Sequence, residues 1–237
     1  MIVQPKGIAR ADCVRSRGIF FPKDKQIIRG RLRGALREHR YEAKESDAVV
    51  GLLQPGDVVL ELGGGIGYMS TLAATKCDIA HVHTFEANPH LIPYIERVHA
   101  ANGVTNATVH NALLGARKGS AEFHVRFNLL ASSLVEPVEG TVLSVEKIEV
   151  RNARQTSTEI APTVLICDIE GAEADVIPRL NLSTVRAACV ELHPQWIGPE
   201  GVAAVFGAFA KAGLTYYHGG SHGKVVCFSR DWSVKPV

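Results

Sequence analysis

The chain has 237 residues, of which 46% are hydrophobic, and its formal net charge is +2 at pH 7. This composition is typical of a globular protein with a sizeable core and excludes a chain that is disordered throughout. No apolar run reaches the roughly 18 residues that a membrane-spanning helix needs, and we expect neither a secretory signal nor action at a membrane. The five cysteines are scattered and form no CxxC pair, so we expect reduced thiols in a cytoplasmic protein.

Charge is distributed unevenly along the chain. Residues 1–44 hold 12 Lys and Arg against 4 Asp and Glu, a balance of +8, whereas the rest of the chain holds 14 against 20, a balance of −6. Apolar positions at helical spacing predict one or two helices within 27–53. We therefore expect a basic, helical N-terminal extension over residues 1–46, which is either a solvated amphipathic helix or a lid over an anionic small-molecule acceptor. The main body lacks the basic, aromatic-rich surface of a nucleic-acid-binding domain, so nucleic acid is not an expected partner.

Apolar strands and helices alternate along residues 47–237. The predicted strands are 58–62, 80–86, 107–115, 120–127, 141–150, 163–171, 186–194, 214–218 and 224–230, and the predicted helices are 67–77, 88–102, 172–180 and 200–213. This alternation predicts one doubly wound α/β domain with a mostly parallel sheet. Ligands of such domains bind beyond the carboxyl ends of the strands.

Glycines crowd the end of the first of these strands, in the stretch "VLELGGGIGYMS" at 59–70. A dinucleotide fingerprint GxGxxG fails in both registers, because position 68 is Tyr68 and position 70 is Ser70. Glu86 ends the next strand and can accept hydrogen bonds from both hydroxyls of a ribose. Asp168 ends a later strand and is expected at the same edge. A nucleoside ligand without a pyrophosphate is therefore favoured.

The spacing E-x-G-x-G-x-G, formed by Glu61, Gly63, Gly65 and Gly67, resembles motif I of the class I S-adenosylmethionine-dependent methyltransferases. The block "VLICDIEGAEADVI" then resembles the most specific motif of one of their families, the FkbM methyltransferases. Shorter matches to the same family are "YE" at 41–42, "FEANP" at 85–89, "ASSL" at 131–134 and "ELHP" at 191–194. The resemblance extends over roughly residues 40–215.

This resemblance implies a Rossmann-like fold of seven mostly parallel strands with an antiparallel last strand, and S-adenosylmethionine as the cofactor. It also implies a set of cofactor-binding residues. Those at the methionine and ribose end are Glu61, Gly63, Gly65, Gly67, Glu86 and Asp168, and those at the adenine end are Ala87, Asn111 and Ala112. Asp168 faces either the methionine amino group or the acceptor.

The implied reaction is methyl transfer to an acceptor, most often to a hydroxyl of a small molecule or sugar. His193 follows a core strand and is our first candidate for the general base, with Glu170 and Glu173 as further candidates. Asp168 completes the candidate catalytic group. These four side chains together can also bind a divalent cation, but the resemblance implies no metal and none is expected. N-methylation, for example of a nucleobase, and a catalytically silent cofactor-binding module are the alternatives.

Overall fold

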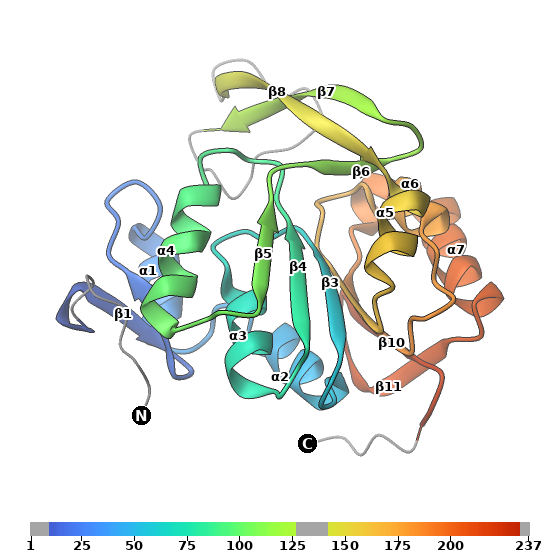
Figure 1. The fold of residues 1–237 in the computed structure, drawn as a ribbon, viewed down its shortest axis with the longest axis horizontal. Coiled ribbons are helices and arrows are strands. Elements are labelled where there is room, and N and C mark those ends of the chain that lie inside the picture. The colour runs from blue at the N-terminus through green and yellow to red at the C-terminus, as the bar shows by residue number, and fades with distance from the viewer. Residues whose placement is uncertain (1–9, 127–141, 233–237) are drawn as a thin grey trace.

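The computed structural model describes residues 10–126 and 142–232, and its centre is a seven-stranded sheet (Figure 1). The strands lie in the order β11 (Thr215–His222), β12 (Val225–Ser229), β10 (Ala187–Glu191), β9 (Val164–Cys167), β3 (Val58–Leu62), β4 (His81–Phe85) and β5 (Ala107–His110). Strand β12 is antiparallel to both neighbours, and the other pairs are parallel. The predicted Rossmann-like sheet with an antiparallel last strand is confirmed.

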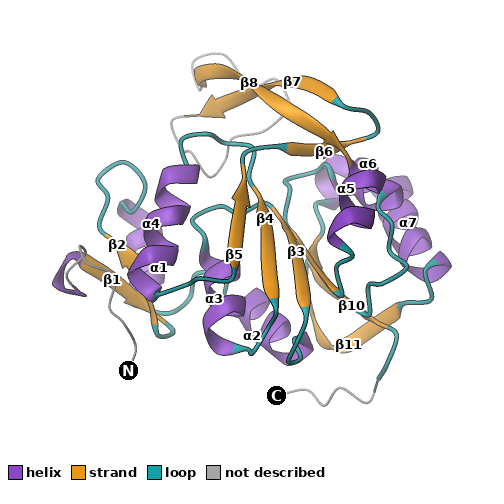
Figure 2. Cartoon of the chain, viewed as in Figure 1, coloured by secondary structure: helices purple, strands orange, loops and turns teal. Residues whose placement is uncertain are grey.

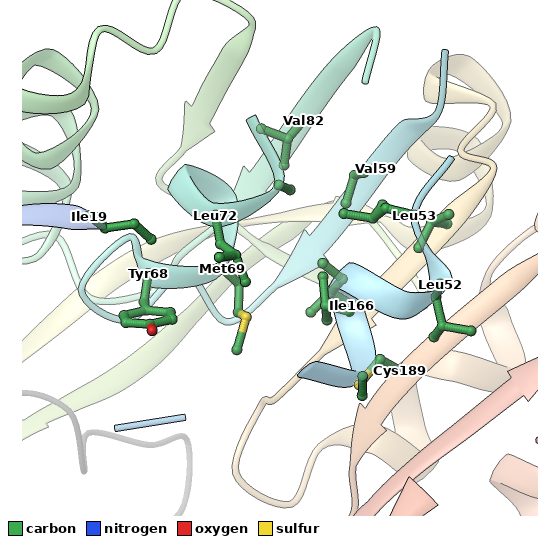
Figure 3. Packing of buried hydrophobic residues seen from close by; sticks show 14 of the residues in the cluster. Ile19, Leu52, Leu53, Val59, Tyr68, Met69, Leu72, Val82, Ile166 and Cys189 are labelled. Atoms are coloured by element: carbon green, nitrogen blue, oxygen red, sulfur yellow. The ribbon is translucent and has the colours of Figure 1, made fainter. Parts of the chain in front are cut away.

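Helices cover both faces of this sheet (Figure 2). Successive strand residues point to opposite sides, so the apolar strands place buried side chains on both faces. Val59 lies in one core with Leu52 and Leu72, whereas Leu60 lies in the other core with Phe209. Figure 3 shows side chains of the first core. The helices of the first face are α2 (Ala43–Leu52), α3 (Tyr68–Lys76) and α4 (Ile92–Asn102), and those of the second are α5 (Ala153–Ile160), α6 (Glu173–Val176), η3 (Ile177–Arg179) and α7 (Pro194–Lys211).

In residues 10–46, the described part of the N-terminal extension, a hairpin stands beside the expected helices. The described part contains η1 (Arg10–Asp12), a hairpin of β1 (Cys13–Ser16) and β2 (Ile19–Pro22), and then α1 (Gly30–Arg37). Arg17 and Gly18 join the two strands and both have positive φ, the conformation of a tight two-residue hairpin turn. Ile19 and Phe21 are buried in the first core, and the expected boundary at residue 46 falls inside α2. The role of the extension as a lid stays a prediction.

A second, three-stranded sheet contains the strands predicted at 120–127 and 141–150. Its order is β6 (Leu113–Gly115), β8 (Val142–Asn152) and β7 (Gly119–Arg126), and it lies beyond the carboxyl end of β5 (Figure 1). Its buried residues Phe123, Val125 and Ile148 pack against Ala87. The "ASSL" stretch at 131–134 lies outside the described residues.

A buried ion pair holds the opposite, amino edge of the main sheet. Asp57 is 4% exposed, and Arg186 binds it through two guanidinium nitrogens. The hydroxyl of Thr163 donates to the same carboxylate at 2.7 Å. The five cysteines are all free in the structure. In the part of the chain that the structure describes, no helix is both long enough and apolar enough to cross a membrane.

Candidate active site

The glycines of the loop between β3 and α3 differ in what lies around them. Gly63 has φ +88°, and a Cβ there would lie 1.8 Å from the carbonyl oxygen of Asp168. Gly67 has φ +74°, and a Cβ would lie 3.0 Å from Ile95. Gly65 also has a positive φ, +51°, but its Cβ would meet no protein atom within 4 Å. Close packing therefore explains Gly63 and Gly67, whereas Gly65 faces open space at the carboxyl edge.

Glu61 lies beneath this loop and is 1% exposed. Its carboxyl group accepts hydrogen bonds from the Ser70 amide at 3.1 Å and the Thr84 hydroxyl at 2.5 Å. Burial raises the pKa of Glu61 to about 8, although these hydrogen bonds lower it. Glu61 thus supports the start of α3 from within the protein. Direct contact of this residue with a cofactor stays a prediction.

Glu86 connects the chain segments that follow β3 and β4 through hydrogen bonds of its side chain. Its carboxylate accepts hydrogen bonds from the amide of Gly65 at 2.8 Å and from the amide of Asn88 at 2.7 Å. Burial raises the pKa of Glu86, and the backbone hydrogen bonds oppose that rise. The Gly64 and Ala87 amides also lower this pKa, so a ligand hydroxyl would share the carboxylate with backbone donors. A ribose bound to this carboxylate would lie next to the open side of Gly65.

The residues predicted at the adenine end gather around the chain segment that follows β4. The Asn111 side-chain amide donates to the carbonyl oxygens of Glu86 and Ala87, both at 3.0 Å. Ala112 is buried in the second core, and Ala87 is half-buried against the three-stranded sheet. Asn111 therefore fixes the backbone of residues 86–87, which is how it would shape an adenine site.

His193 occupies the centre of an acidic cluster at the ends of β9 and β10. It is 3% exposed, and its Nδ1 lies 2.8 Å from Oε1 of the fully buried Glu173. A carboxylate only accepts hydrogen bonds, so this contact assigns the proton to Nδ1. The hydrogen bond with Glu173 raises the pKa of His193, against the lowering effect of burial. Nε2 faces Glu170 Oε2 at 3.4 Å and Asp168 Oδ1 at 3.9 Å.

Asp168 links this cluster to the glycine loop. Its amide donates to the carbonyl oxygen of Leu62 at 2.9 Å, and its own carbonyl oxygen fills the space that a side chain at Gly63 would need. The side chain is 42% exposed, but its Oδ1 is shielded and has no hydrogen-bond partner among the described residues. Burial raises the pKa of Asp168 to about 7, and repulsion from Glu191 and Glu170 adds to the rise.

Two further acids lie at this edge, and the sequence motifs assigned no role to either. Glu42 lies between α1 and α2 in a left-handed conformation, with φ +46°. Burial raises its pKa to about 8, and repulsion from Asp168, Glu45 and Glu61 adds to the rise against a hydrogen bond with Tyr41. Glu191 ends β10 with its Oε1 3.8 Å from His193 Nε2. The "YE" and "ELHP" matches were the available signals, because Glu42 and Glu191 lie within them.

Comparison with known proteins gives no matching family model and no matching curated protein. Among solved structures, a "putative transferase" from Pyrococcus horikoshii is 13% identical, with a TM-score of 0.50 over 90% of this chain and 68% of that chain. Trm5b from Pyrococcus abyssi is 13% identical, with a TM-score of 0.48 over 91% of this chain and 53% of that chain. TYW2 from M. jannaschii, solved with AdoMet, is 12% identical, with a TM-score of 0.47 over 92% and 85%. Together with the strand order, the P. horikoshii likeness identifies the fold as a Rossmann-like α/β fold.

Proposed function

We propose that this chain is a methyltransferase that uses S-adenosylmethionine. The observation that carries the proposal is the crowding of carboxyl groups at the carboxyl edge, where Glu42, Glu61 and Asp168 all have raised pKa values. For Glu42 and Asp168, repulsion between carboxyl groups is among the causes of the rise. A cationic ligand would relieve this repulsion, and S-adenosylmethionine carries both a sulfonium and an ammonium group. The pyrophosphate of a dinucleotide would instead be repelled.

In this proposal each part of the cofactor contacts residues that suit its chemical groups. The ribose hydroxyls donate to Glu86, and the cofactor passes over the open side of Gly65, where a Cβ would meet no protein atom within 4 Å. The ammonium group lies toward the carboxyl group of Asp168, whose side chain is 42% exposed. Adenine lies beside Ala87, which Asn111 positions through the backbone. The same arrangement leaves His193 on the acceptor side.

The proposed reaction is an in-line displacement at the methyl carbon. The acceptor oxygen forms a bond to this carbon, the carbon–sulfur bond breaks, and its electron pair stays on sulfur as a neutral thioether. The enzyme contributes chiefly by aligning the two reactants. An alcohol acceptor must also lose its proton, and we place that loss at His193, with Asp168 and Glu170 beside it. An O-methyltransferase of the FkbM type, working on a small and anionic cytoplasmic molecule, is the finer form of the proposal.

Calorimetric titration of the purified chain with S-adenosylmethionine, and separately with NAD, tests the cofactor. We expect S-adenosylmethionine to bind more tightly, and equal or tighter binding of NAD would reject the proposal. A screen of hydroxylated and amino-group acceptors with methyl-labelled cofactor then tests catalysis. Label on oxygen supports the finer proposal, and label on nitrogen supports an N-methyltransferase. Cofactor binding without any transfer would favour the silent binding module.

A further inference from the structure

We propose that Asp168, Glu170 and Nε2 of His193 bind one divalent cation of the Mg²⁺ or Mn²⁺ type. One ligand atom from each residue lies within 4.8 Å of the other two. Nε2 is 3.4 Å from Glu170 Oε2 and 3.9 Å from Asp168 Oδ1. A small cation bound at about 2.1 Å from each donor holds its donors about 3 to 4 Å apart, so little movement is needed to close the site. This departs from the expectation, drawn from the sequence, of no metal.

The buried histidine supplies an observation that is independent of the acidic cluster. His193 is 3% exposed, and Nε2 makes no hydrogen bond within the described residues although it points at carboxylates. Its other nitrogen is held by Glu173, which is fully buried. Metal-binding histidines usually donate their second N–H to a carboxylate in this way, which fixes the tautomer and the ring orientation. In the neutral form of His193, the ring held by Glu173 therefore presents the Nε2 lone pair at the position where a cation would lie.

The local charge also favours a cation over a simple ion pair. One imidazole ring faces four carboxyl groups, with Glu173 at Nδ1 and with Asp168, Glu170 and Glu191 around Nε2. Even a protonated ring offers one positive charge to this group. Asp168 Oδ1 has no hydrogen-bond partner among the described residues, although it is shielded. Carboxylates suit Mg²⁺ and Mn²⁺, and free Mn²⁺ is detected directly by electron paramagnetic resonance, so Mn²⁺ serves as the probe.

The use of such a cation rests on the proposed function. A hydroxyl bound to a divalent cation loses its proton more readily, because the cation stabilises the alkoxide that forms. The proton would leave to solvent water, and the alkoxide would attack the methyl carbon. His193 would then act as a ligand and would not itself accept the proton.

The test measures Mn²⁺ binding directly, by the loss of the free Mn²⁺ signal in electron paramagnetic resonance. It uses the full chain freed of metal by a chelator, without cofactor or acceptor. We expect one Mn²⁺ per chain and at least about tenfold weaker binding in Glu170→Gln, whose side chain is 48% exposed, so that folding should tolerate the change. Asp168→Asn serves as a second variant. Glu96→Gln, on the exposed face of α4, is the matched control and should bind Mn²⁺ as the wild type does.

Absence of Mn²⁺ binding to the wild type at millimolar concentration would overturn the site. Equal affinity in Glu170→Gln and the wild type would overturn it too, because the ion would then lie elsewhere. Calorimetry with S-adenosylmethionine on the same preparation separates the two proposals. Cofactor binding without Mn²⁺ binding would reject the metal site alone and return His193 to the role of general base.

Discussion

Replacing Gly65 with alanine separates the two reasons for glycine in the loop. The added Cβ would meet no protein atom within 4 Å, so the packing of the fold should survive. The same methyl group would project into the space where we place the cofactor. Gly63→Ala makes no such distinction, because its Cβ would lie 1.8 Å from the carbonyl oxygen of Asp168. Gly65 is therefore the position at which binding can be lost while folding is kept.

The size of each effect follows from the local geometry. Gly65 has φ +51°, and a residue with a side chain costs about 1–2 kcal/mol in the left-handed region. The free energy of unfolding should fall by that amount. A ligand that must move away from a new methyl group should lose at least about tenfold in affinity, which corresponds to about 1.4 kcal/mol.

The assay compares Gly65→Ala with a matched control, Gly103→Ala. Gly103 follows α4 with φ +69°, and a Cβ there also meets no atom within 4 Å. Both variants should lose similar stability in urea unfolding, but only Gly65→Ala should lose affinity for S-adenosylmethionine in calorimetry. A folded Gly65→Ala variant with the dissociation constant of the wild type would refute the placement of the cofactor over this loop.

Three further substitutions test the acids of the two sheet edges. Glu86→Gln turns an amide donor toward backbone N–H groups, so it should cost about 1–3 kcal/mol of stability in urea unfolding. It should also weaken cofactor binding in calorimetry. An unchanged stability or an unchanged affinity would contradict the role given to Glu86. Because the pKa of Glu61 is raised to about 8, the folded state binds more protons than the unfolded state between about pH 4.5 and 8. The free energy of unfolding should therefore decline across this window by up to about 1.4 kcal/mol per pH unit. Glu61→Gln should make the decline shallower in urea unfolding at several pH values. Asp57→Asn weakens the buried pair with Arg186 and should lower the free energy of unfolding in urea by about 3 kcal/mol. Cofactor affinity should not change. A change in affinity would show that the two edges of the sheet are coupled.

The main sheet could be predicted because its strands are short apolar runs that alternate with helices. The predicted strand 58–62 coincides with β3, and the predicted strand 80–86 contains β4. The hairpin of the extension escaped prediction because its strands have four residues each and its turn, Arg17–Gly18, lacks the usual asparagine or aspartate. The assignment of residues 119–126 and 142–152 to a separate sheet depends on pairing between distant segments, which local pattern does not encode.

The candidate site was predictable at the level of its residues but less so at the level of their contacts. Motif spacing places Gly65, Glu86 and Asp168 at one edge, and the fold brings them there. Spacing alone does not show that Gly63 serves the close approach of β9, since that approach joins residues more than 100 positions apart. Glu42 was missed because its position depends on the left-handed turn between α1 and α2.

The two edges of the main sheet differ in how their buried carboxyl groups are satisfied. At the amino edge, Oδ1 of Asp57 is bound by Arg186 and Thr163, and Oδ2 is bound by Arg186 and the Gln54 amide. At the carboxyl edge, Asp168 Oδ1 has no such partner within the described residues. Buried polar atoms in folded proteins nearly always have a hydrogen-bond partner. Asp57 is therefore satisfied within the protein, whereas Asp168 keeps one shielded oxygen for the positively charged ligand that we propose.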